Sequence, residues 1–165
     1  VALSAALKKL SYMSAATMFI LYSALTGIAL SPIFLIYTLG SIYTTFLITS
    51  GMFGIMALYG YYTESDLTGL GSILFMGVLG LILVRFINMF VGSSHMEFLL
   101  SVGGVIIFTL LTAYDVQKIK HMSMLAALHE DAEGKIAIFG ALILYLDFIN
   151  LFIRLLRLMG NKKRN

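Results

Sequence analysis

The sequence predicts an all-α protein, a polytopic bundle of helices that spans a lipid bilayer. Of its 165 residues, 60% are hydrophobic and only 12% are charged. A soluble domain is about 45–50% apolar and about 25% charged, so this chain has too little polar surface to cover a globule in water. The apolar residues also come in unbroken runs of about twenty, the length of a membrane-spanning helix. A membrane β-barrel would instead alternate apolar and polar residues over about ten positions.

We expect a single transmembrane domain over residues 1–165, with five membrane helices. The expected helices are residues 10–30, 33–61, 70–91, 98–117 and 136–158. The first follows Lys8 and Lys9, and it ends at Ser31-Pro32 because proline ends one helix and can begin the next.

The other four helices are separated by polar connections. The second is longer than the ~20 residues that a crossing needs, so it is expected to tilt or to bend near Gly51 or Gly54. The third is interrupted only by Arg85 and Asn88. The one long polar segment, residues 118–135, separates the fourth helix from the fifth.

One polar seam runs down the last predicted helix. It consists of Asp147, Asn150, Arg154 and Arg157. Their spacings of three, four and three residues place them within about 80° of one another on a helix. A charge at membrane depth costs at least ~2.5–3.5 kcal/mol, and an aspartate is too short to reach the interface as an arginine can. Asp147 is therefore expected to face protein or a wet cavity and to have a partner.

The predicted partner of Asp147 is Asp115, near the end of the preceding helix. Two carboxyl groups that face each other would share a proton and titrate as a coupled unit. The shared proton makes a hydrogen bond between two helices, whereas its loss creates repulsion and a site that attracts a cation. Because carboxylate oxygens suit Ca²⁺, Asp115 and Asp147 are also the candidate metal ligands.

Basic residues offer a different explanation of the two aspartates. Either aspartate could form an ion pair with Arg85, Arg154, Lys118 or a residue of a further helix. Arginines near the ends of a membrane helix can also reach the interface without any partner. We therefore count Arg85, Arg154 and their neighbour Asn150 as candidate latch or supporting residues.

Composition also limits the partners. The chain has no cysteine, which excludes disulfides and thiolate metal sites. The net charge is +3, and the basic residues gather at helix ends, a pattern that reflects orientation in a membrane better than nucleic-acid binding. The expected partners are the lipid bilayer, Ca²⁺ and protons, with other membrane proteins as a further class; nucleic acid is not expected.

Two runs of sequence resemble a known family. LLTAYDVQKIKHM (residues 110–122) and ALILYLDFINLFIRLLRLMG (residues 141–160) are similar to the last two helices of the bacterial branch of the Bax inhibitor-1 family. This family is also called the transmembrane Bax-inhibitor-motif family. GIALSPI (residues 27–33) resembles the turn after its third helix. Family members have seven membrane helices, the last surrounded by the other six, and this chain resembles helices three to seven, without the first two.

The resemblance implies a pH-sensitive calcium-leak channel or exchanger in which Asp115 and Asp147 are the proton sensor and gate. It also implies a basic residue that latches this pair from the end of the second helix. Lys8 and Lys9 lie in the comparable stretch, with lysine where arginine is usual. Ca²⁺ would be the transported ion, and neither a cofactor nor an enzymatic activity is expected. The expected location is a bacterial inner membrane, with an organelle membrane as the alternative.

Two other functions fit the residues. A non-transporting regulator of cell survival, or of a membrane protease, would act through helix contacts alone. An intramembrane aspartyl protease also uses two aspartates on neighbouring helices to activate water, and Tyr114-Asp115 matches the first half of its site. The second half normally reads GxGD, whereas Leu144-Tyr145-Leu146-Asp147 has no glycine, which disfavours this function.

Overall fold

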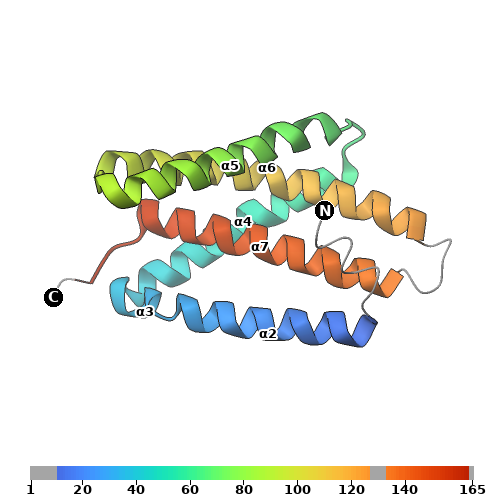
Figure 1. Ribbon diagram of the computed structural model, residues 1–165, viewed down its shortest axis with the longest axis horizontal. Helices are drawn as coiled ribbons and strands as arrows, with labels where there is room; N and C mark the ends of the chain where they lie inside the picture. The colour runs from blue at the N-terminus through green and yellow to red at the C-terminus, as the bar shows by residue number, and fades with distance from the viewer. Residues whose placement is uncertain (1–10, 127–132, 164–165) are drawn as a thin grey trace.

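A computed structural model of the protein describes residues 11–126 and 133–163. These residues form a bundle of α-helices (Figure 1). The helices are α2 (Tyr12–Leu30), α3 (Ile33–Ile36), α4 (Leu39–Tyr62), α5 (Thr68–Val91), α6 (Ser94–Ala126) and α7 (Glu133–Met159). Five helical spans in this part of the chain are long and apolar enough to cross a membrane. The prediction of an all-α bundle with five membrane helices is therefore confirmed.

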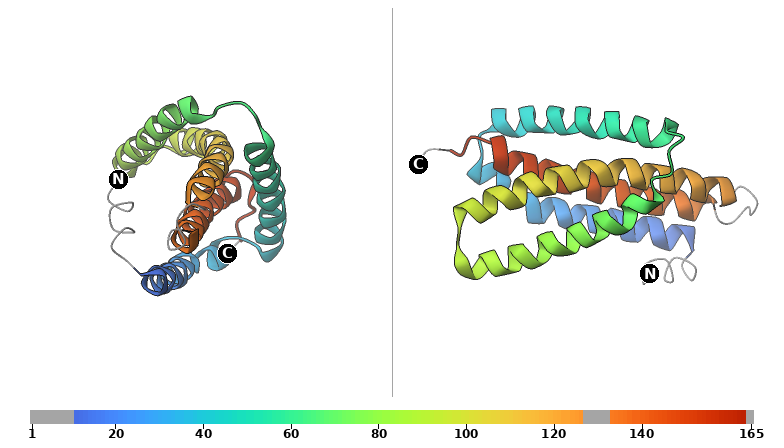
Figure 2. Two further views of the ribbon diagram at one scale, coloured as in Figure 1. Left: turned by 90° about the vertical axis from the view of Figure 1, so that its right-hand side faces the viewer. Right: turned by 90° about the horizontal axis from the view of Figure 1, so that it is seen from above.

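Helix α7 lies inside the bundle, as the end-on view in Figure 2 shows. Its most extensive packing is with α6, and α2 and α4 also contact it. Helix α5 packs against α6 on the other side. Helices α6 and α7, which carry the predicted aspartate pair, therefore pack against each other more extensively than any other two helices of the described bundle.

The distribution of side chains is that of a protein embedded in a lipid bilayer. Large apolar side chains such as Ile73, Met89 and Phe90 are exposed on the outer surface of α5. Some hydroxyl groups lie inside: Thr49 and Thr112 are fully buried, and each donates a hydrogen bond to a carbonyl oxygen of its own helix. Small buried hydroxyl residues let membrane helices approach closely. The exposed apolar side chains on the outer surface are available to contact the bilayer.

The second predicted helix, residues 33–61, is not continuous. Tyr37 and Thr38 are extended and separate the short α3 from α4, so the first membrane span runs from Tyr12 to Ile36. Their backbone pairs with the C-terminal tail: Thr38 N–H donates to Asn161 O at 3.0 Å, and Lys163 N–H donates to Ile36 O at 2.9 Å. The tail thus satisfies backbone groups that an interrupted helix would leave without partners.

Proline at position 163 tests this pairing. We expect Lys163→Pro to lower the free energy of unfolding by about 1–2 kcal/mol, because proline can donate neither to the Ile36 carbonyl through an N–H nor to the Phe34 carbonyl through an ammonium group. Lys162→Pro is the matched control, since the Lys162 N–H makes no hydrogen bond within the described residues. Thermal unfolding in detergent would measure both. Equal midpoints for the two variants would show that the tail contributes nothing.

Helix α6 is longer than predicted. It continues for nine residues beyond Gln117, so the expected polar loop at residues 118–135 is wrong in its first half. The helix persists because its side chains still have partners there: Ile119 packs against Gly140 of α7, and Lys120 Nζ donates to Tyr61 O at 2.7 Å. The rest of that loop up to residue 132 lies outside the described residues.

Candidate functional site

Asp115 of α6 and Asp147 of α7 meet at the interface between their helices. Both are buried, with 9% and 5% of their surface exposed. The two carboxyl groups lie within hydrogen-bonding reach of each other. Two ionised carboxylates have no donor between them, so a hydrogen bond here requires a proton on one of the two groups. The structure therefore brings together the two aspartates that were predicted to be neighbours.

One buried oxygen atom of the pair lacks a hydrogen-bond donor. Asp147 Oδ2 is buried and has no hydrogen-bond partner within residues 11–126 and 133–163. A buried polar atom without a partner costs about 1–3 kcal/mol, so the site is built at the expense of stability. Lys118 lies one turn from Asp115, with its ammonium 5.7 Å from the centre of the Tyr114 ring.

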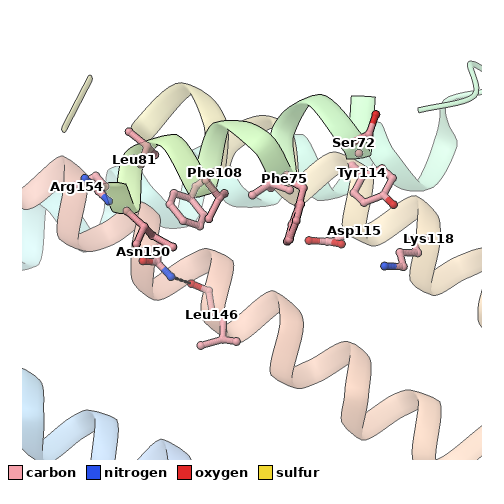
Figure 3. A pocket seen from close by; sticks show the side chains of 14 residues that line it. Ser72, Phe75, Leu81, Phe108, Tyr114, Asp115, Lys118, Leu146, Asn150 and Arg154 are labelled. Atoms are coloured by element: carbon pink, nitrogen blue, oxygen red, sulfur yellow. Dashed lines mark hydrogen bonds between the residues drawn. The ribbon is translucent and has the colours of Figure 1, made fainter. Parts of the chain in front are cut away.

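A cavity of about 670 Å³ opens beside the carboxyl pair, between α5, α6 and α7. In Figure 3, Asp115 and Lys118 lie at one end of it and Arg154 lies at the other. Aromatic rings of Phe75 and Phe108 lie between these ends. The cavity therefore has polar ends and an apolar middle.

A second cavity, of about 380 Å³, continues from the first. Arg85 and Glu97 line it, and it shares Leu81, Ile82 and Arg154 with the first cavity. The two cavities together form a groove along the bundle, which we call the α5–α7 groove. Asp115 lies at one end of this groove and Glu97 lies at the other.

The predicted latch and supporting residues do not bond to the carboxyl pair. Arg85 pairs with Glu97 at 3.1 Å, Arg154 Nη1 donates to Leu100 O at 3.0 Å, and Asn150 Nδ2 donates to Leu146 O of its own helix at 2.8 Å. All three of these predicted residues do line the α5–α7 groove.

The other proposed latch residues, Lys8 and Lys9, lie outside the described residues.

Gln117 and Lys120 have roles that the sequence did not predict. Gln117 Oε1 accepts the Leu67 N–H at 2.9 Å, and its Nε2 donates to Ser65 O at 2.8 Å. Lys120 caps the end of α4 through Tyr61 O at 2.7 Å and lies over the ring of the same tyrosine. These two residues fix the connection between α4 and α5 beside the Asp115 end of the groove.

Glu97 is the second residue that the sequence did not single out. Its Oε1 lies 3.1 Å from Nη1 of both Arg85 and Arg157. One carboxylate thus joins three helices at the far end of the groove. The signal in the sequence was charge balance, because Glu97 is the only acidic residue between Asp66 and Asp115.

Asp115 and Asp147 alone supply too few oxygen ligands to complete a Ca²⁺ coordination shell. Ca²⁺ takes six to eight oxygen ligands, and Asp115 and Asp147 supply at most four. No group of three or more histidine, aspartate, glutamate or cysteine side chains that could hold a metal occurs among the residues described. A cation at this pair would need water or carbonyl oxygens as its further ligands.

The fold and the site define an integral membrane protein, a polytopic helical bundle with a buried pair of carboxyl groups. The chain belongs to the Bax inhibitor-1 family, because the family model described as inhibitor of apoptosis-promoting Bax1 matches residues 1–164. This match confirms the family that the two sequence runs indicated.

Bacterial relatives are similar over nearly the whole chain. An uncharacterized protein of Borreliella burgdorferi is 51% identical over 164 residues, which are 99% of this chain and 71% of the relative. The inner membrane protein YbhL of Escherichia coli K12 is 48% identical over 164 residues, 99% of this chain and 70% of YbhL. A protein of Rickettsia prowazekii is 44% identical over 155 residues, 94% of this chain and 65% of that protein.

Proposed function

We propose that this protein is a pH-gated pathway for Ca²⁺, a leak channel or exchanger, in which Asp115 and Asp147 sense the proton and control opening. The observation that supports the proposal is the burial of these two carboxyl groups next to each other, between α6 and α7. A bacterial inner membrane is the proposed location, since the Escherichia coli relative is named an inner membrane protein.

The shared proton is the closing element of the proposed mechanism. While one carboxyl is protonated, its hydrogen bond ties α6 to α7 at the most closely packed interface of the bundle. When that proton leaves, two negative charges face each other. At about 4 Å and an effective dielectric constant of about 20, their repulsion is about 4 kcal/mol, which favours separation of the two side chains.

Opening and ion entry are coupled in this scheme. The two unprotonated carboxylates repel each other but attract a divalent cation. Asp115 lines the cavity from which such a cation would arrive. Ca²⁺ and the proton therefore compete for the same oxygen atoms. Flux should rise as the pH rises through the titration of the pair, and it should fall as the pH is lowered.

Asparagine substitutions test the proposal. In proteoliposomes loaded with a Ca²⁺ indicator, we expect the wild-type flux to increase at least tenfold between pH 5 and pH 8. Asp147→Asn and Asp115→Asn should show a low, pH-independent flux, because the asparagine amide donates a hydrogen bond to the remaining carboxylate at every pH.

Asp66→Asn is the control for this experiment. Asp66 lies in the exposed connection between α4 and α5, where hydrogen bonds from the side chain and backbone N–H of Thr68 hold the pKa of its carboxyl below the usual value. It therefore stays ionised over the pH range tested, and its removal should leave the flux profile unchanged. Identical profiles in the wild type and in both asparagine variants of the pair would refute the proposal.

A further inference from the structure

The α5–α7 groove is long enough to serve as a path across the membrane. Its end residues, Glu97 and Asp115, are eighteen positions apart on α6, which is about 27 Å along a helix. The hydrocarbon core of a bilayer is about 30 Å thick. The groove therefore covers most of the depth that an ion would have to cross.

Arg154 lies where the two cavities of the groove meet, since it lines both. It is buried, and its side chain lies across α6. The position is possible because residue 104 is a glycine: a Cβ there would lie 2.8 Å from both Cδ and Nε of Arg154. A hydrogen bond to Leu100 O at 3.0 Å completes the contact with α6. The guanidinium is thus held in place between the cavities.

The charge of Arg154 is not compensated as those of its neighbours are. Arg85 of α5 and Arg157 of α7 both pair with Glu97 of α6. Arg154 has no carboxylate within 4.0 Å among the described residues. An ionised side chain inside a membrane protein is costly, and it normally marks a function rather than a contribution to stability. Here the positive charge lies where the two cavities share lining residues.

We propose that Arg154 is the selectivity-determining residue of the pathway, a fixed positive charge that each cation must pass. This inference rests on the proposed function. At a given distance a divalent cation is repelled twice as strongly as a monovalent one. Arg154 therefore limits Ca²⁺ to a slow leak and favours monovalent ions over it.

Thiol chemistry can set the charge at this position, because the chain has no cysteine of its own. In proteoliposomes at pH 8, Arg154→Cys should pass Ca²⁺ at least tenfold faster than the wild type. Reaction with 2-aminoethyl methanethiosulfonate, which restores a positive charge, should return the flux to within twofold of wild type. Reaction with 2-sulfonatoethyl methanethiosulfonate, which adds a negative charge, should raise it further.

Arg157→Cys is the matched control. It removes the same charge one turn further along α7, at a residue that lines neither cavity. Its Ca²⁺ flux should change less than twofold with either reagent. If the flux through Arg154→Cys is the same with both attached charges, Arg154 has only a structural role and the inference is overturned.

Arg154→Met provides an independent test should Arg154→Cys fail to fold. Methionine is unbranched and uncharged, so it can still lie over Gly104 while the positive charge is lost, and Ca²⁺ flux at pH 8 should rise at least tenfold. An unchanged flux overturns the inference.

The two proposals fail differently. A charge-dependent flux that does not respond to the Asp115 and Asp147 substitutions overturns the proposed gate and supports the role of Arg154. A pH-gated flux that does not change with the charge at position 154 overturns the role of Arg154 alone. The absence of Ca²⁺ flux through the wild type and every variant overturns both.

Discussion

Gly60→Ala is expected to lower the free energy of unfolding by about 3 kcal/mol, the upper part of the range for overpacking. A Cβ at Gly60 would lie 2.1 Å from the carbonyl oxygen of Ala113 and 2.8 Å from its Cα. The obstacle is the backbone of α6, which cannot move aside as a flexible side chain can. The substitution would therefore have to separate α4 from α6, two residues away from Asp115.

Gly54→Ala is the matched control for this prediction. It lies on the same helix, and a Cβ there would have no neighbour within 4 Å. Alanine in a helix is favoured over glycine by about 0.5–1 kcal/mol, so this variant should be as stable as the wild type or slightly more stable. Thermal unfolding of both variants in detergent would measure the difference. Equal stability would mean that α4 and α6 do not approach each other as closely as described.

The pairing of Asp115 with Asp147 could be predicted because the bilayer leaves so few alternatives. They are the only acidic residues inside the predicted membrane helices, and neither is long enough to reach the interface. Adjacent helices joined by one connection pack against each other. The cost of a charge inside the membrane and the order of the helices along the chain therefore indicated the same pair. The structure places these two carboxyl groups next to each other.

The interruption at Tyr37 and Thr38 could not be predicted from local sequence. Neither residue is a glycine or a proline, and residues 33–61 contain no charged side chain. The backbone partners of this segment come from Asn161 and Lys163, more than 120 residues further along the chain. Only the folded bundle brings them together.

The role of Lys120 was missed because of an error in one boundary, whereas Gln117 lay inside the predicted helix and its partners come from a distant connection. With α6 expected to end at residue 117, the polar residues that follow resemble an exposed loop. Since the helix continues, Lys120 instead faces the end of α4, while Gln117 holds the backbone of Ser65 and Leu67. Polarity beyond the hydrocarbon core does not distinguish a loop from a helix that packs against the neighbouring connection.

A disulfide between α6 and α7 is expected to abolish the pH-dependent flux. A Cβ on Gly140 would lie 3.0 Å from Cγ2 and 3.4 Å from Cγ1 of Ile119, both of which are bonded to Ile119 Cβ. Cysteines at these two positions would therefore have Cβ atoms no more than about 4.5 Å apart, within the range of a disulfide. Replacing isoleucine by cysteine also removes one γ-carbon and makes room for the second sulfur.

This cross-link would act directly on the proposed gate. Ile119 lies one turn beyond Asp115, and Gly140 lies two turns before Asp147, so the disulfide would tie the two helices beside the carboxyl pair. If loss of the shared proton opens the pathway by separating α6 from α7, oxidised Ile119→Cys/Gly140→Cys should leak at pH 8 no faster than at pH 5. Reduction should restore the rise in Ca²⁺ flux, and the flux through neither single cysteine variant should change with redox state. Full flux at pH 8 through the oxidised double variant would show that the helices need not part, so that loss of the proton would act only by exposing charge to the cation.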